Sequence, residues 1–155
     1  MEFAGEAQKG ISIDLEGVWE MTEQTVINID DVPLMDRGNG KQFAVKWGRV
    51  RPLVGLNALG CAVHVVPPGK KAFPFHRHHV MDELFFVVSG EGEYRFGDTT
   101  VPVRSGDIVA APAGTEAHQL INTGSNDLRI SAFRPWAGST SSTIPIPKRS
   151  PSPQA

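Results

Sequence analysis

Three residues in the middle of the chain, His76, His78 and Glu83, have types and spacing that suit metal binding. His76 and His78 are two positions apart, so in an extended strand both imidazoles point to the same face. Glu83 follows a short polar turn and opens a second strand, so its carboxylate could return to the same point. Two neutral nitrogens and one anionic oxygen that converge suit a divalent transition metal. His118 is the candidate for a fourth ligand.

The elements that must position these residues are predicted to be strands. Short β-branched or alternating segments are separated by turns that contain Gly, Pro and Asp. A short strand is expected over 26–29, and the later ones are expected over 43–47, 60–66, 83–89, 93–96, 100–103, 108–111, 117–122 and 128–133. The segment that carries His76 and His78 is expected to be a strand as well. Many short, evenly spaced strands are typical of an all-β sandwich or barrel.

The predicted strand over 83–89 is apolar at almost every position. If Glu83 faces the interior, the other odd-numbered residues do too, and Leu84, Phe86 and Val88 face outward. Apolar character on both faces implies that both faces are covered. The outward cover could be the N-terminal arm or a second subunit, and we expect a homodimer.

Length and composition predict one globular domain. A chain of 155 residues can bury a hydrophobic core of its own. We expect an N-terminal arm over 1–24, a β-barrel domain over 25–136 and a Ser/Pro-rich tail over 137–155. The tail has almost nothing to bury, so it is expected to be flexible.

Several classes of partner are excluded by charge and hydropathy. A formal net charge of −2 argues against a nucleic-acid binder, whose footprint is normally basic. No apolar run reaches the ~18 residues of a membrane helix, and the first ten residues lack the features of a secretory signal. Cys61 is the single cysteine, so no internal disulfide can form and a cytoplasmic location is expected.

Two motifs in this chain resemble those of the cupin superfamily. The first comprises two histidines, four residues, a glutamate, six residues and a glycine: His76-x-His78, Glu83 and Gly90. The second comprises a glycine, five residues, Pro-x-Gly, three residues, a histidine, three residues and an asparagine: Gly106, Pro112, Gly114, His118 and Asn122. The flanks also resemble small single-domain bacterial cupins of the cupin 2 conserved-barrel type, some of which carry a sugar-phosphate-isomerase label.

The resemblance implies a single jelly-roll β-barrel that binds one divalent transition metal ion (Fe, Mn, Ni, Co or Zn). By analogy His76, His78, Glu83 and His118 would be the metal ligands, and Asn122 would be structural. Four ligands around a six-coordinate ion leave two positions for water, substrate or dioxygen. Three imidazoles and one carboxylate leave such a site with positive charge, so it should attract anionic oxygen ligands.

A pocket is expected inside the barrel, lined by the inward residues of the central strands: Phe85, Val87, Tyr94, Phe96, Ile108 or Val109, and Leu120. Tyr94 is the only hydroxyl among them, so it is the candidate catalytic residue, although an ordinary core role is open for each. Trp47, Arg49 and Arg51 are candidates for the mouth, where an arginine could pair with a substrate anion. His64 is assigned to the core or surface rather than to the metal.

The sequence leaves more than one function open. The first hypothesis is a metal-dependent enzyme that acts on a sugar, sugar phosphate or keto acid, as an isomerase or as a dioxygenase. The second is a binding or sensing protein without turnover, and the third is a structural barrel with a vestigial site. No helix-turn-helix is visible, which counts against a DNA-binding regulator.

Overall fold

The chain is all-β in the computed structural model, which describes residues 25–136. The predicted arm and tail lie outside these residues. The described part contains nine strands: β1 (Met35–Gly38), β2 (Ala44–Arg49), β3 (Leu59–Val66), β4 (Glu83–Ser89), β5 (Glu91–Phe96), β6 (Thr99–Arg104), β7 (Ile108–Ala111), β8 (His118–Ile121) and β9 (Leu128–Pro135). Two single 3₁₀ turns, η1 (Ile29–Asp31) and η2 (Arg51–Leu53), flank β1 and β2. Within this part of the chain, no helix is long and apolar enough to cross a membrane.

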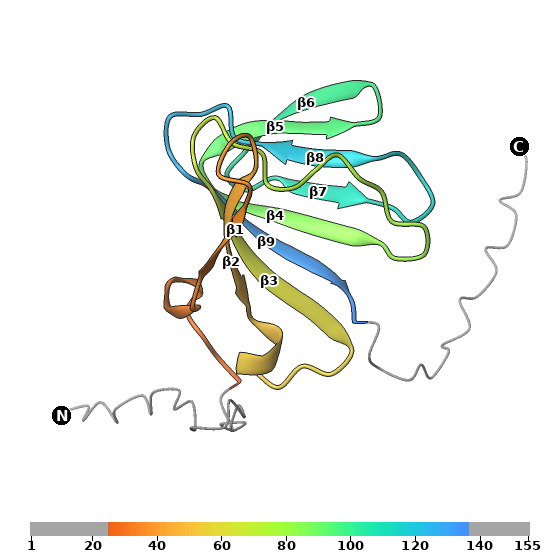
Figure 1. Cartoon of the computed structure of the whole chain (residues 1–155). Helices are drawn as coiled ribbons and strands as arrows, with labels where there is room; N and C mark the ends of the chain where they lie inside the picture. The colour runs from red at the N-terminus through yellow and green to blue at the C-terminus, as the bar shows by residue number, and fades with distance from the viewer. Residues whose placement is uncertain (1–24, 137–155) are drawn as a thin grey trace, which may run out of the picture.

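The strands form two sheets that curve around one interior, as expected for a jelly-roll barrel. The larger sheet has the order β1-β2-β3-β9-β4-β7, and the smaller has the order β6-β5-β8. Figure 1 shows them as a fan, with β5, β6 and β8 on one side of the interior and β1–β3 on the other. The last strand, β9, pairs antiparallel with both β3 and β4, so it joins the two halves of the larger sheet.

The main core lies between the sheets and follows the alternation of side chains along several of the strands. In β4, Phe85 and Val87 are buried, whereas Leu84 is 42% and Phe86 is 40% exposed. The predicted inward and outward faces of this strand are therefore confirmed. The core also contains inward residues of the other strands, namely Val45, Val66, Tyr94, Val103, Val109, Ala111, Leu120, Leu128, Ile130 and Ala132.

The turn between β4 and β5 explains why the first motif ends in glycine. Gly90 has a φ of 85°, a left-handed conformation that favours glycine. A Cβ at this position would lie 2.4 Å from the Asp127 carbonyl oxygen, which is closer than atoms can approach. The sharp turn and the neighbouring chain therefore both require a residue without a side chain here.

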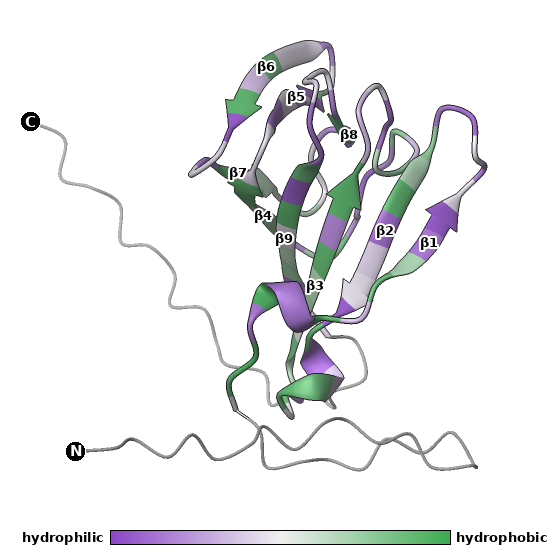
Figure 2. Ribbon diagram, turned by 90° about the vertical axis from the view of Figure 1, so that its left-hand side faces the viewer, coloured by the Kyte–Doolittle hydropathy of each residue, from purple (hydrophilic) through white to green (hydrophobic). Residues whose placement is uncertain are grey.

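In the N-terminal part of the barrel, the strand predicted over 26–29 is wrong, and β1 was not predicted. Residues 25–28 form no strand; instead Asn28 caps the 3₁₀ turn that begins at Ile29, accepting a hydrogen bond from the Asp30 backbone N–H at 2.9 Å. Strand β1 was missed because all four of its residues are exposed and its sequence is Met-Asp-Arg-Gly. Figure 2 shows β1 as hydrophilic along most of its length. It is an edge strand, held by its ladder with β2.

Candidate metal centre

Three segments of the chain bring His76, His78, Glu83 and His118 together. Glu83 and His118 are the first residues of β4 and β8, and the two other histidines lie in the segment between β3 and β4. The expected strand at this segment is wrong, since His76 forms only an isolated bridge with His118. The N–H of each residue donates to the other's carbonyl oxygen, at 3.2 and 2.7 Å. This pair of hydrogen bonds joins two motifs that lie far apart in the sequence.

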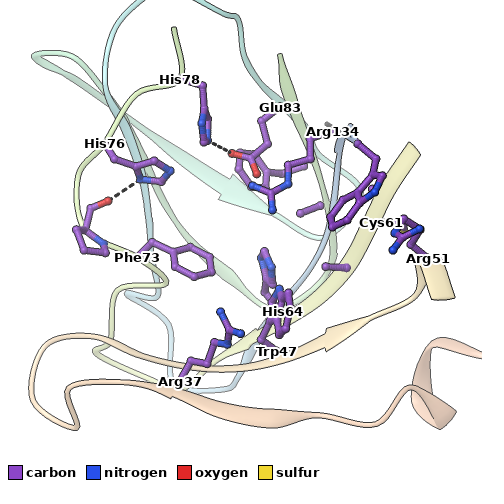
Figure 3. A pocket seen from close by; sticks show the side chains of 16 residues that line it. Arg37, Trp47, Arg51, Cys61, His64, Phe73, His76, His78, Glu83 and Arg134 are labelled. Atoms are coloured by element: carbon purple, nitrogen blue, oxygen red, sulfur yellow. Dashed lines mark hydrogen bonds and ion pairs between the residues drawn. The ribbon is translucent and has the colours of Figure 1, made fainter. Parts of the chain in front are cut away.

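The four side chains form one compact cluster that could bind a metal ion. One ligand atom from each residue lies within 4.8 Å of all the others. The Glu83 Oε2 atom is 3.1 Å from the His78 Nε2 and 3.3 Å from the His118 Nε2. Figure 3 shows the His78 imidazole and the Glu83 carboxylate pointing toward one another. All four predicted ligands are therefore in place around one point.

The chemistry of these donors fits a divalent transition metal. His76 Nδ1 lies 2.7 Å from the Pro74 carbonyl oxygen, which can only accept, so this nitrogen carries the proton and Nε2 is left for a metal. Burial lowers the pKa of His76, which favours the neutral imidazole that metals require. Burial raises the pKa of Glu83, but the hydrogen bond from His118 and the charges of His78 and His118 bring it below its usual value. A neutral His76 imidazole and an ionised Glu83 carboxylate are the forms that a divalent transition metal binds.

A cavity of about 390 Å³ extends from this cluster across the larger sheet. The residues that line it come from β1–β4, η2, β9 and the segments before β4 and after β9. Among them are Arg37, Trp47, Arg51, His64, Phe73, His76, His78, Glu83, Phe85, Arg134 and Trp136. In Figure 3, His76, His78 and Glu83 lie at one end, His64 lies between, and Arg37 lies at the other end. The cavity is therefore charged at both ends.

The cavity does not lie where the sequence placed it. Of the predicted pocket residues, Phe85 lines it, while Val87, Val109 and Leu120 pack in the core. At the mouth Trp47 and Arg51 line the cavity as predicted, whereas Arg49 is outside the lining and its guanidinium lies over the Trp47 ring, 4.9 Å from its centroid. The inner faces of most strands carry similar apolar residues, so the sequence could not distinguish a filled region of the interior from an open one.

Tyr94 is packed in the core rather than on the cavity wall. Its ring lies 6.3 Å from that of His118, centroid to centroid, but its hydroxyl donates a hydrogen bond to the Ala110 carbonyl oxygen at 2.9 Å. Burial and the nearby carboxylate of Glu83 raise its pKa to about 12. A catalytic role for Tyr94 stays a prediction, and this geometry adds no support to it.

Arg37, Arg134 and His64 line the cavity but were not predicted as site residues. Alternation could have found Arg134, because it follows the buried Ile130 and Ala132 at a spacing of two. Arg37 could not be placed without β1. For all three, the missing information was which strands are neighbours.

His64 is an unusual residue in this wall, being a buried imidazole without a hydrogen-bond partner. It is 5% exposed, and its Nδ1 atom makes no hydrogen bond to any described residue. Burial lowers its pKa from 6.5 to about 4, with help from the charges of Arg134 and Arg37 and against the opposing effect of Glu83. The ring is therefore neutral at pH 7.

Comparison with known proteins agrees with this geometry. Residues 62–133 match a family model described as a cupin domain. An oxalate-binding protein of Thermotoga maritima is 33% identical over 67 residues, which are 43% of this chain and 54% of that protein. An uncharacterized protein of Methanocaldococcus jannaschii is 29% identical over 66 residues, 43% of this chain and 51% of that one. The chain thus spans about half the length of the curated relatives it matches.

Solved structures share the fold. A sugar phosphate isomerase from a cupin superfamily, from Silicibacter pomeroyi, aligns with a TM-score of 0.64 and 20% identity, covering 72% of this chain and 75% of that one. A predicted oxalate decarboxylase from Thermotoga maritima aligns with a TM-score of 0.62 and 24% identity, covering 71% of this chain and 97% of that one. At these identities the likeness concerns the fold alone.

Proposed function

Since residues 62–133 match the model of a cupin domain, we propose that this chain is a metal-dependent enzyme that acts on a small oxygenated anion. The observation that carries the proposal is the charge of the cavity: three guanidiniums, those of Arg37, Arg51 and Arg134, line it against the single carboxylate of Glu83. A cavity of about 390 Å³ has the size of a small-molecule site. A sugar phosphate or a keto acid would match this charge and this size.

The cluster His76, His78, Glu83 and His118 would hold one divalent ion, of Fe, Mn, Ni, Co or Zn. When bound, such an ion supplies Lewis-acid chemistry to a carbonyl or hydroxyl oxygen. Arg134 lines the same cavity and acts electrostatically on Glu83, so its guanidinium can pair with a substrate oxyanion next to the cluster.

The remaining wall residues would orient the substrate and exclude water. Phe73 and Phe85 line the cavity with apolar surface beside the cluster. His64 is neutral and offers a ring nitrogen as a hydrogen-bond donor or acceptor. The reaction would be an isomerisation or a dioxygenation.

A binding protein without turnover is the second candidate. Among the described residues that line the cavity, Glu83 is the only carboxylate and there is no lysine. An isomerase needs a group to move a proton, and the pKa of about 4 for His64 makes it a weak base. One relative is named an oxalate-binding protein, and an anion held without turnover would suit the same positive cavity.

The experiment is metal analysis of protein purified without added metal, followed by oxygen uptake and product analysis with keto acids, diols and sugar phosphates. Stoichiometric iron with oxygen consumption would support a dioxygenase. Zinc or manganese with isomerised product and no oxygen uptake would support an isomerase. Metal with tight anion binding but no product would favour the binding protein. Protein that takes up no divalent metal would refute the proposal.

We also propose that the chain is a cytoplasmic homodimer, joined through the outer face of β4 and β7. Phe86 lies opposite Ile108 in this pair of strands, and Ile108 is 69% and Leu84 42% exposed. Three exposed apolar side chains on neighbouring strands suit an interface with a second copy. Light scattering coupled to size exclusion would test this: we expect a dimer that Phe86→Lys converts to a monomer, whereas a monomeric parent protein would contradict it.

A further inference from the structure

The end of the cavity opposite the metal cluster carries its own guanidinium, that of Arg37. Strand β1 is four strands away from β4 in the larger sheet, which at ~4.8 Å per strand is roughly 19 Å along the sheet. The sheet is curved, and the side chains of Arg37 and Glu83 both point into the cavity. The distance between them across the cavity is therefore shorter than the distance along the sheet. Figure 3 shows Arg37 reaching into the space below His64, across from His78 and Glu83.

The register of β1 and β2 explains why the side chain of Arg37 faces the cavity although all four residues of β1 are exposed. Arg37 lies opposite Val45, which is buried, so this face of β1 is the interior face. Trp47 is two residues further along the same face of β2, diagonal to Arg37. The Arg37 guanidinium carbon lies 4.0 Å from the centroid of the Trp47 ring. Such stacking holds the guanidinium plane in place and leaves its N–H groups free at the edge.

Arg37 has no counter-ion in the described part of the chain. The ion pairs there join Arg129 to Asp30 and Glu83 to its two neighbouring histidines. Arg51, by contrast, donates a hydrogen bond from Nη1 to the Leu56 carbonyl oxygen at 3.1 Å. Arg37 therefore combines stacking on Trp47 with N–H groups that form no ion pair in the described part of the chain, an arrangement that can bind an oxyanion.

His64 provides an independent sign that a ligand lies between the two ends. It stands opposite Trp47 in the register of β2 and β3, so it belongs to the same inner face. Its Nδ1 atom is buried without a hydrogen-bond partner among the described residues, and unsatisfied buried polar atoms are rare in proteins. A polar ligand that spans the cavity would pass this imidazole and could form a hydrogen bond with it.

We infer that Arg37 is a specificity-determining residue that binds the far end of a two-ended anion, whose near end occupies the metal cluster. The ligand would carry a 2-oxo or 2-hydroxy carboxylate at one end and a second oxyanion, a carboxylate or a phosphate, at the other. The inference rests on the proposed function, because the near end needs the metal. It adds that a short dianion such as oxalate would reach only the near end of the site.

Matched pairs of 2-oxo acids test this, with binding measured by calorimetry on the full chain loaded with manganese. Each pair has the same carbon chain and differs in a terminal carboxylate: oxaloacetate and 2-oxobutyrate, 2-oxoglutarate and 2-oxopentanoate, 2-oxoadipate and 2-oxohexanoate. We expect the dianion to bind about tenfold tighter at the chain length that reaches Arg37, as for a charged hydrogen bond. Phosphonopyruvate against oxaloacetate, which have the same chain up to the terminal group, shows whether a terminal phosphonate is preferred to a carboxylate.

Variants of Arg37 and Arg49, which both lie on the Trp47 ring, test whether Arg37 is responsible for the preference for the dianion. Arg37→Gln should weaken the binding of the dianion far more than that of the monoanion and so abolish the preference, and Arg37→Lys should retain part of it. Arg49→Gln is the matched control, because Arg49 also lies on the Trp47 ring but does not line the cavity. It should keep the full preference.

The two possible failures differ in what they show. If the manganese-loaded protein binds none of these 2-oxo acids, the keto-acid form of the proposed function is refuted, and the inference with it. If it binds them but prefers the dianion at no chain length, or keeps the preference after Arg37→Gln, only the inference is refuted. Urea unfolding of each variant confirms that a lost preference is not a lost fold.

Discussion

Replacing His64 by phenylalanine should make the protein less sensitive to acid. The native pKa of this imidazole is about 4, against 6.5 for an unperturbed histidine, because burial disfavours its charged form. A histidine with a lowered native pKa takes up its proton in the unfolded state first, so stability is lost as the pH falls below 6.5 and the loss is complete below about 4. Between pH 7.5 and pH 5 this single group should lower the free energy of unfolding by about 2 kcal/mol.

The variant His64→Phe removes this contribution and leaves no hydrogen-bond partner behind, since the Nδ1 atom has none among the described residues. At pH 7.5 we expect the variant to be as stable as the wild type within about 1 kcal/mol. At pH 5 it should be more stable by about 2 kcal/mol. Urea unfolding at both pH values, with metal removed by EDTA, measures the two differences.

Metal-free protein is used so that metal loss does not contribute to the pH dependence. Wild type and His64→Phe then contain the same cluster histidines, whose effects on the free energy of unfolding cancel in the difference. His79→Phe is the control, because His79 is an exposed residue of the segment before β4. It should retain the steep acid sensitivity of the wild type. Parallel pH profiles for wild type and His64→Phe would show that His64 is not the buried neutral group described above.

Three further predictions concern the metal cluster and its support. His118→Ala should reduce the bound metal per chain at least tenfold, measured by elemental analysis, while circular dichroism stays that of a β-protein; full metal content would exclude His118 as a ligand. Bound metal should be lost as the pH falls from about 6 to 5, because the imidazoles must be neutral, although the lowered pKa of His76 delays its protonation; stoichiometric metal after dialysis at pH 4 would contradict this. Asn122→Ala should lower the free energy of unfolding by about 2–4 kcal/mol, because this fully buried amide donates to the carbonyl oxygens of Val66 and Asn126; a loss below 1 kcal/mol in urea unfolding would mean that these bonds are replaced.

The strands and the ligand cluster were largely predictable because they depend on local signals. Alternation gave the faces of β4, and the two motifs gave the four residues whose ligand atoms lie within 4.8 Å of one another. The segment of His76 was predicted as a strand because alternation cannot distinguish an isolated bridge from a ladder.

The shape of the cavity was not predictable, because it depends on which strands are neighbours. Arg37 lies on a polar edge strand that carries no hydrophobic pattern, and its partner Trp47 is identified only by the register of β1 with β2. His64 could be placed on an inner face by alternation, but not opposite Trp47. Tyr94 was placed in the pocket because an inward tyrosine has the same pattern whether it fills the core or borders a cavity.

The position of β9 between β3 and β4 has a consequence for biosynthesis. The ribosome releases β3 and β4 long before their common partner, so both expose open hydrogen-bonding edges until residues 128–135 emerge. Arg134 and Ala132, which complete the cavity wall, come from the same late strand. A nascent chain that ends before residue 128 should therefore be prone to aggregation and unable to hold an anion, even though every residue of the metal cluster has already been made.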